Sequence, residues 1–304
     1  MKAIPLKISS QVQKAIDSGK AVLALESTVI THGLPYPQNI EYLNDIEALA
    51  EEQGVIPATI CVLNGECCIG LEPQDIEILK GKMQKGDELH KLTLRDLGLA
   101  LAQKQSGGTT VSATMALAEM AGIKVFVTGG IGGVHRGWQE SRDISLDIKA
   151  LAQIPVIVVC AGCKAILDIG ATLEALETEG VPVYAWQTDE FPSFYSRKSG
   201  HIVSQIDSAK AIVQAFKIMQ DFDKVHSGML IACPIPTQAE IPFEEIEPYI
   251  QQAIKAASNI SGKALTPYLL DHLAKSTEGR SVKANLALLE NNLKLGALIA
   301  KEMT

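Results

Sequence analysis

Residues 125–164 read VFVTGGIGGVHRGWQESRDISLDIKALAQIPVIVVCAGCK, and this stretch decides the fold. Its two apolar runs, 125–127 and 156–159, are short, β-branched and bounded by Gly or Pro, which favours buried parallel strands over helices. Each run opens into a loop, and ligands of open α/β sheets lie beyond the carboxyl ends of such strands. The first loop carries four glycines followed by His135, Arg136, Asp143 and Asp147, and the second loop carries Lys164.

The rest of the chain alternates between strand-like and helix-like patterns. Further buried strands are predicted at 21–25, 181–186 and 229–232, and helices at 12–18, 38–53, 97–102, 115–121, 166–170, 173–179 and 208–220. The pair Asn64-Gly65 between two apolar runs predicts a β-hairpin. From Phe243 onward the pattern predicts three helices, the last over 281–303. We therefore expect an α/β fold with three α/β/α layers, a mixed, mostly parallel central sheet and a C-terminal helical segment.

The composition limits the classes of protein to consider. The chain has 304 residues, 47% of them hydrophobic, which is enough for a large core, and no linker or internal repeat divides it. One domain over 1–304 is the prediction. No apolar run reaches the ~18 residues of a transmembrane helix, and residues 1–5 show no secretory segment. We expect a cytoplasmic protein without a membrane partner. The net charge of −8, with no basic block, argues against a nucleic acid polymer as a partner.

Two cysteines in the second loop allow two interpretations. Cys160 and Cys163 have the spacing of a redox or metal motif, but no second pair follows at zinc-ribbon spacing and nothing else resembles thioredoxin. The alternative is that Cys160 ends a buried strand and that Cys163 packs in a turn.

Other candidate residues also follow strands or precede helices. Glu26 comes directly after an apolar run, where it is either a functional carboxylate or a hydrogen-bonded structural one. The stretch 106–114 is rich in glycine and hydroxyl residues ahead of a helix, which suits either a phosphate or a simple N-cap. The aromatic loop 191–195 could stack on a base or cover the core.

Several of these motifs, taken together, resemble one family. They are the segments 24–28, 32–33, 57–60, 108–111, 128–137, 143–145 and 159–164, with 266–270 and Asn285 toward the end of the chain. This set resembles the pseudouridine-5'-phosphate glycosidase family, also called the indigoidine-synthase-A-like proteins. The similarity covers nearly the whole chain. Two departures are Cys233, where an Asn is expected before Pro-Ile-Pro, and the 277–281 segment.

The resemblance implies reversible cleavage of the C–C glycosidic bond of pseudouridine 5'-phosphate to uracil and ribose 5-phosphate, in pseudouridine catabolism. It implies that Lys164 is the nucleophile, Glu26 the proton donor and Asp143 the ligand of Mn²⁺, with Mg²⁺ or another divalent ion as the alternative. The substrate-binding positions that it implies are Lys91, Thr110, Val111, Ser145, Asp147 and Asn285. It also implies a homotrimer.

Such a reaction has definite chemical needs. Uracil C5 must gain a proton while the sugar carbon loses the bonding electrons, so an acid and an electron sink are required. A lysine imine with the ring-opened sugar is such a sink, and Lys164 can form it only as a neutral amine. Two other interpretations remain open: another Schiff-base lyase, such as an aldolase for a sugar phosphate, and a sugar-phosphate-binding or assembly module without activity.

Overall fold

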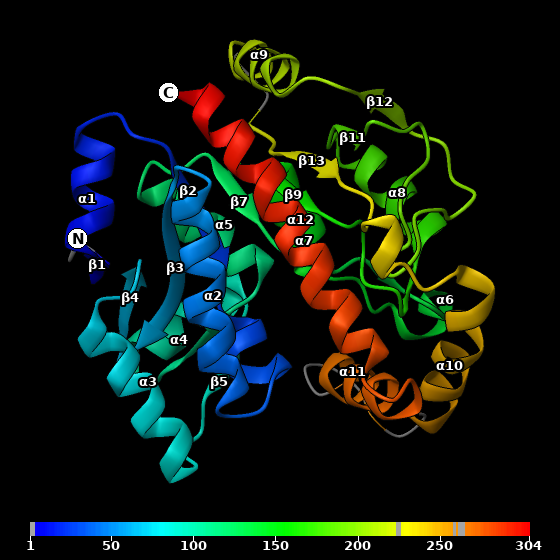
Figure 1. The fold of residues 1–304 in the computed structure, drawn as a ribbon, viewed down its shortest axis with the longest axis horizontal. Helices are drawn as coiled ribbons and strands as arrows, with labels where there is room; N and C mark the ends of the chain where they lie inside the picture. Colours follow the sequence, from blue (N-terminus) through cyan, green and yellow to red (C-terminus); the bar gives the residue numbers. More distant parts are fainter. Residues whose placement is uncertain (1–3, 223–225, 258–259, 261–264) are drawn as a thin grey trace. The chain divides into compact units, whose positions relative to one another are not determined.

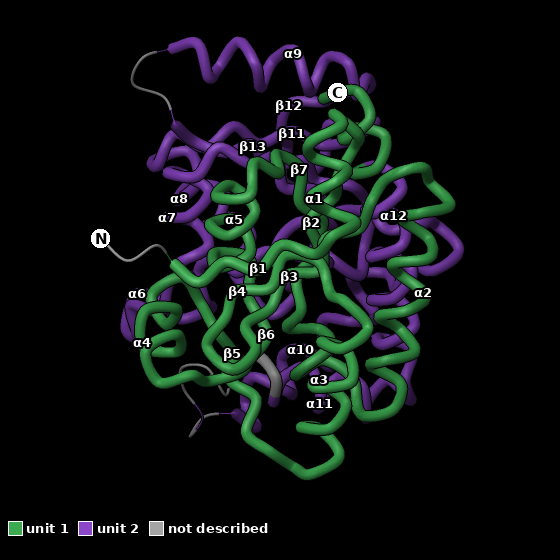
Figure 2. The backbone as a smooth tube through the Cα atoms, turned by 90° about the vertical axis from the view of Figure 1, so that its left-hand side faces the viewer, with its two compact units in different colours: residues 1–127, 296–304 green, residues 128–295 purple. Residues whose placement is uncertain are grey.

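The computed structural model describes residues 4–222, 226–257, 260 and 265–304 (Figure 1). It divides into two compact units, one of Met1–Val127 with Gly296–Thr304 and one of Thr128–Leu295 (Figure 2). Residues 1–3 belong to the start that was expected to lack a secretory segment, and they lie outside the described residues. One functional domain over 1–304 stays a prediction.

A mixed sheet forms the centre of the first unit. Its strands are β1 (Leu6–Ile8), β2 (Val22–Glu26), β3 (Ile56–Leu63), β4 (Glu66–Ile69), β5 (His90–Leu92), β6 (Gly107–Thr109) and β7 (Val125–Val127). The order is β1-β4-β3-β2-β7, with β6 also paired to β3 and β5 to β6. Strand β2 runs parallel to β3 and β7, whereas β3 and β4 are antiparallel. Asn64 and Gly65 turn this predicted hairpin at φ 49° and 82°, as a two-residue turn requires.

The helices of this unit follow the strands closely. They are α1 (Ser10–Asp17), the π-helix η1 (Val29–Gly33), α2 (Gln38–Glu52), α3 (Pro73–Lys85), the 3₁₀ turn η2 (Leu94–Asp96), α4 (Leu97–Ala102) and α5 (Val111–Met120). Helix α5 begins at Val111, so the predicted start at Met115 is wrong. The reason is that the hydroxyl groups ahead of Met115 are buried inside the unit: Thr114 Oγ1 donates to Thr109 Oγ1 at 2.9 Å.

The second unit contains a parallel sheet and most of the C-terminal helices. Strand β9 (Ile157–Cys160) pairs with β13 (Met229–Ala232), then come β11 (Val183–Trp186) and β12 (Ser204–Ile206). A separate ladder joins β8 (Val134–His135) to β10 (Leu167–Asp168). The helices are α6 (Trp138–Ser141), α7 (Leu146–Gln153), α8 (Ile169–Thr178), α9 (Ala209–Gln220), the 3₁₀ turn η3 (Thr237–Ala239), α10 (Phe243–Ala256), α11 (Leu265–Ser276) and α12 (Arg280–Met303). The part of α12 from Gly296 onward belongs to the first unit.

One predicted helix of this unit is partly wrong. The segment 166–170 was expected to be helical, but Leu167 and Asp168 form β10 instead. Leu167 pairs with His135 and is buried, while the Asp168 carboxylate accepts a hydrogen bond from Ala171 N at 3.0 Å and caps α8. Tertiary pairing therefore overrides the local helical pattern and delays the helix to Ile169.

The predicted fold class is confirmed: a mixed, mostly parallel sheet with helices on both sides and a C-terminal helical segment. The three helices expected after Phe243 are present as α10, α11 and α12. Within the described residues, no helix combines the length and the apolar character that crossing a membrane requires.

Candidate active site

In the first unit, the turn after β2 is held by buried hydroxyl groups. Glu26 is the last residue of β2. The Ser27 hydroxyl donates to Ile60 O at 2.6 Å and accepts from Thr109 N at 3.0 Å, and Ser27 is fully buried. Thr28 Oγ1 donates to Thr109 O at 2.7 Å. These bonds fix the backbone that follows Glu26 to the end of β6.

Lys91 lies beside the same end of β6. It is opposite Gly108 in the parallel β5–β6 register, and Thr110 N donates to Leu92 O at 2.9 Å just before α5 begins at Val111. A Cβ on Gly108 would lie 2.8 Å from Ser27 O, so only glycine lets these segments meet. The first unit therefore brings together the predicted residues Glu26, Lys91, Thr110 and Val111.

His32 joins this group through the π-helix. Its Nδ1 lies 2.7 Å from Thr31 Oγ1. Burial and the positive charge of Lys91 lower the pKa of His32 below its ordinary value, so the imidazole is neutral at pH 7. The π-helix itself is held by Asn39, whose buried amide donates to Ile30 O at 2.8 Å. The sequence marked the His32-Gly33 pair but gave it no role.

In the second unit, backbone hydrogen bonds join two loops: the glycine loop, residues 128–133, and the Lys164 loop, residues 161–166. Ala161 N donates to Gly129 O at 2.9 Å, and Ile131 N donates to Gly162 O at 3.1 Å. Lys164 N then donates to Ile131 O at 3.0 Å. The backbone of Lys164 is thus fixed beside the glycine loop, and its side chain is half-buried.

Ser145 and Asp147 reach the same loop from the start of α7. Asp147 Oδ2 accepts from Gly132 N at 2.8 Å, while Ser145 Oγ accepts from Asp147 N at 3.2 Å and caps the helix. A Cβ on Gly132 would lie 2.7 Å from Asp147 Oδ2, and a Cβ on Gly129 would lie 3.2 Å from Asn285 Oδ1. The predicted residues Ser145, Asp147, Lys164 and Asn285 therefore surround one glycine loop.

Asp143 lies further out, next to β8. His135 N donates to Asp143 O at 3.1 Å, and His135 Nε2 is 3.9 Å from Asp143 Oδ2. The Asp143 side chain is 40% exposed. Across the described part of the chain, no cluster of three or more His, Cys, Asp or Glu side chains could hold a metal ion. A carboxylate is a hard oxygen ligand of the kind that a divalent cation takes together with water, and the Mn²⁺ that the resemblance implies at Asp143 stays a prediction.

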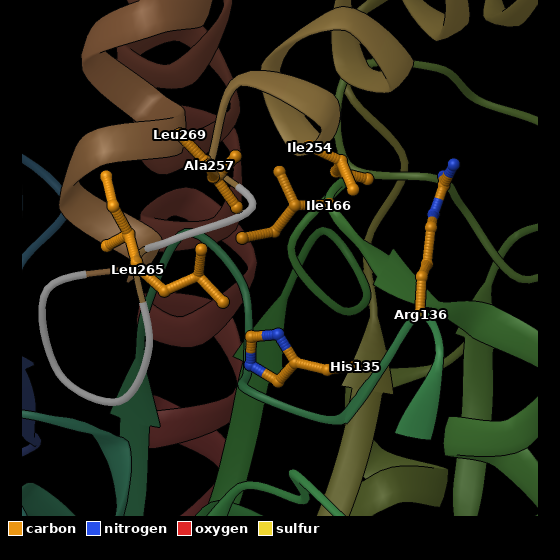
Figure 3. A pocket seen from close by; sticks show the side chains of 8 residues that line it. His135, Arg136, Ile166, Ile254, Ala257, Leu265 and Leu269 are labelled. Carbon is orange, nitrogen blue, oxygen red and sulfur yellow. The ribbon is translucent and has the colours of Figure 1, made fainter. Parts of the chain in front are cut away.

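A cavity of about 190 Å³ lies beside His135 in the same unit (Figure 3). Its lining is mostly apolar and comes from the β8 end, the Lys164 loop and the helices α10 and α11: His135, Arg136, Ile166, Ile254, Ala257, Ile260, Leu265 and Leu269. In Figure 3 the side chains of His135 and Arg136 extend in different directions. His135 ends β8, whereas Arg136 lies in the turn that follows it.

The structure decides between the interpretations left open for the cysteines and the aromatic loop. All six cysteines are free and buried. Burial raises the pKa of the Cys160 and Cys163 thiols to about 12, so the packing interpretation holds. Phe191, Phe194 and Tyr195 are each less than 5% exposed, so these aromatic side chains cover the core.

The departure at Cys233 also lies in the core. Cys233 is buried, its N–H donates to Cys160 O at 2.7 Å, and its Sγ accepts from Asn291 Nδ2 at 3.1 Å. The 277–281 segment contains the turn 277–279 and the first two residues of α12, and Ser281 N donates to Thr277 Oγ1 at 3.1 Å. Neither departure involves a hydrogen bond to Lys164 or Asp143.

Sequence reasoning missed two residues that support the glycine loop. Asn292 is fully buried on α12 and donates to Thr128 O at 2.9 Å. Thr172 on α8 accepts from Val134 N at 3.0 Å. Both act on backbone groups more than thirty positions away, so no local pattern could have indicated them.

The model of the family described as "Indigoidine synthase A like protein" matches residues 11–302. The chain belongs to this family. The resemblance noted from the motifs is thereby confirmed. Relatives named pseudouridine-5'-phosphate glycosidase include one from Clostridium botulinum, 47% identical over 302 residues, which are 98% of this chain and 97% of that protein. Another, from Geobacillus kaustophilus, is 45% identical over 98% of this chain and 99% of that protein.

Two solved structures share the fold over the whole chain. An indigoidine synthase A-like protein from Thermotoga maritima is 35% identical, with a TM-score of 0.88 over 98% of this chain and 96% of that one. The prealnumycin C-glycosynthase AlnA, solved in complex with ribulose 5-phosphate, is 33% identical, with a TM-score of 0.89 and the same coverage.

Proposed function

We propose that this protein is an enzyme that reversibly cleaves the C–C glycosidic bond of pseudouridine 5'-phosphate, giving uracil and ribose 5-phosphate in pseudouridine catabolism. The observation that carries the proposal is the 47% identity, over 98% of the chain, to a relative of that name. The ribulose 5-phosphate complex of a structural neighbour supports a phosphorylated pentose as the ligand class.

Lys164 supplies the electron sink. Its amine displaces the ring oxygen from the sugar C1', and the proton of the resulting ammonium passes to that oxygen, which becomes the C4' hydroxyl. The nitrogen lone pair then forms the imine as the C1'–C5 bond breaks. Water hydrolyses the imine and releases ribose 5-phosphate. This role is supported by the bond from Lys164 N to Ile131 O, because a nucleophile must be held in a fixed position.

Glu26 supplies the proton that uracil C5 takes up with the bonding electrons. A general acid needs a defined position as well as a suitable pKa. Glu26 ends β2, and the next two residues are bound to β6, so its backbone has little freedom.

The remaining predicted residues bind the substrate. Lys91 and the start of α5, with Thr110 and Val111, combine a cation with the positive end of a helix dipole, which is the chemistry that a 5'-phosphate requires. In the second unit Ser145, Asp147 and Asn285 supply the polar groups for the sugar and the base.

The metal, the assembly and the compartment complete the proposal. Asp143 would hold one Mn²⁺ per subunit, or another hard divalent ion, which would add positive charge to polarise bound oxygen atoms. We further propose a cytoplasmic homotrimer.

Release of uracil from pseudouridine 5'-phosphate tests the function. We expect wild-type protein to release uracil from this C-glycoside and to leave uridine 5'-phosphate, the matching N-glycoside, intact. We expect Lys164→Ala and Glu26→Gln to lower the rate by at least about 100-fold. Uracil release by Lys164→Ala at the wild-type rate would exclude the imine route.

A second candidate is formation of a C-glycoside as the main direction. The neighbour named C-glycosynthase favours it. Incubation with ribose 5-phosphate and uracil measures this direction. A synthetic rate above the cleavage rate at equal concentrations would favour synthesis, and the absence of any product would exclude it.

A further inference from the structure

The guanidinium of Arg136 donates hydrogen bonds to the segment that follows Lys164. Arg136 Nε donates to Leu167 O at 3.3 Å, and one terminal nitrogen donates to Ala165 O at 3.2 Å. These two carbonyls lie one and three positions after Lys164. On the other side of Lys164, its own N–H is bound to Ile131 O. The backbone around this lysine is therefore held from both sides.

Glu247 of α10 holds the guanidinium in turn. It accepts two hydrogen bonds from Arg136, at 2.6 and 3.0 Å, in the two-pronged geometry that arginine forms with carboxylates. Gln251, one turn further along α10, donates to the same carboxylate at 2.6 Å. The Arg136 and Glu247 side chains are 25% and 21% exposed, so water competes only weakly for this pair.

The ionisation of Glu247 favours a stable ion pair with Arg136. Burial alone would raise the pKa of Glu247, but the bonds from Arg136 and Gln251 hold that pKa below its ordinary value. The carboxylate is therefore charged at neutral pH. Lysine could not replace Arg136, because an ammonium group lacks the planar fork that serves a carboxylate and two carbonyls at once.

We propose that Arg136 and Glu247 form a positioning pair that couples α10 to the Lys164 segment and sets the position from which the Lys164 amine attacks the sugar. This rests on the proposed function, because it assigns the attack to Lys164. The pair touches backbone carbonyls rather than the reacting atoms, so neither residue is catalytic. A nucleophile displaced by about 1 Å can lose about 100-fold in rate while ligand binding persists.

The test compares imine formation with ligand affinity. Arg136→Gln, Arg136→Lys, Glu247→Gln and the double variant Arg136→Gln/Glu247→Gln are mixed with ribose 5-phosphate and borohydride, and the rate of adduct formation on Lys164 is followed by peptide mass mapping. Affinity is measured separately with ribitol 5-phosphate, which has no carbonyl carbon. Glu245→Gln is the matched control, since it breaks an Arg–Glu pair of the same helix, with Arg280, away from Lys164.

We expect the three single variants to slow trapping about 10- to 100-fold, with affinity for ribitol 5-phosphate changed less than about twofold. The double variant should be no slower than the slower single one, because both residues act through one pair. The urea midpoint of each variant shows whether it folds. If Arg136→Gln does not fold, the trapping rate of Glu247→Gln alone decides whether the pair positions Lys164.

Trapping at the wild-type rate in Glu247→Gln would overturn the positioning role. Equal slowing in Glu245→Gln would overturn it too, because the effect would then belong to α10 in general. Failure of wild-type protein to form any adduct on Lys164 is a different result, and it would overturn the proposed function together with this inference.

Discussion

Replacing Gly132 by Ala tests the architecture of the glycine loop. The added Cβ would lie 2.7 Å from Asp147 Oδ2 and closer still to Ser145 Oγ, and each of these atoms accepts a backbone hydrogen bond. Asp147 would have to release Gly132 N, which costs about 1–3 kcal/mol for a half-buried N–H group. Ser145 would lose its cap on α7, which costs about 1 kcal/mol. We therefore expect the free energy of unfolding to fall by about 2–4 kcal/mol.

Urea unfolding followed by circular dichroism measures this loss, and uracil release should fall with it because Ser145 and Asp147 are proposed substrate contacts. Gly81→Ala is the matched control: it lies in α3 with open space around it, so the same change should leave stability equal or raise it by up to about 1 kcal/mol. A loss below about 0.5 kcal/mol for Gly132→Ala would refute the steric argument.

Three further predictions concern the rest of the molecule. Ser27→Ala removes the acceptor of the buried Thr109 N–H and should lower the free energy of unfolding in urea by about 2–3 kcal/mol. The control Ser18→Ala, at an exposed helix end, should change it by no more than about 0.5 kcal/mol. Equal effects would contradict a stabilising role of the Ser27 bond. Burial raises the pKa of Glu47, so the folded state keeps the carboxyl proton to higher pH than the unfolded chain does. The protein therefore loses stability as the pH rises from 4.5 through the pKa of the folded state. Glu47→Gln should keep the bond from Thr59, flatten that dependence and be more stable at pH 7; a less stable variant would contradict it. Burial also raises the pKa of four of the six thiols to about 11 or 12. A thiol reagent at pH 8 should therefore label these four only after denaturation. Rapid labelling of the native protein would contradict their burial.

The sequence predicted elements whose signals are local. The Asn64-Gly65 hairpin has a turn that only such residues favour, and β7 and β9 are continuous apolar runs rich in β-branched residues. Strands β1, β6 and β12, with three residues each, carry no such pattern and exist because a neighbouring strand pairs with them. The start of α5 at Val111 was missed for a related reason, since its hydroxyl residues suggest a loop until their buried partners are known.

The same distinction holds for the candidate site. Glu26 and Lys164 could be selected because Glu26 ends a strand and Lys164 follows one within a few residues. Arg136 carried a charge in the key loop, but its partner Glu247 lies 111 positions away. Asn292 supports Thr128 over a still larger separation of 164 positions. Contacts of this kind depend on the folded topology, and no spacing in one sequence encodes them.

Borohydride trapping with ribose 5-phosphate, followed by peptide mass mapping, tests the central claim most directly. We predict a reduced pentose phosphate adduct on Lys164 of the wild-type protein, and no adduct at that position in Lys164→Ala. Protein that binds ribitol 5-phosphate yet forms no adduct on Lys164 would contradict the covalent mechanism and favour a binding role for the chain.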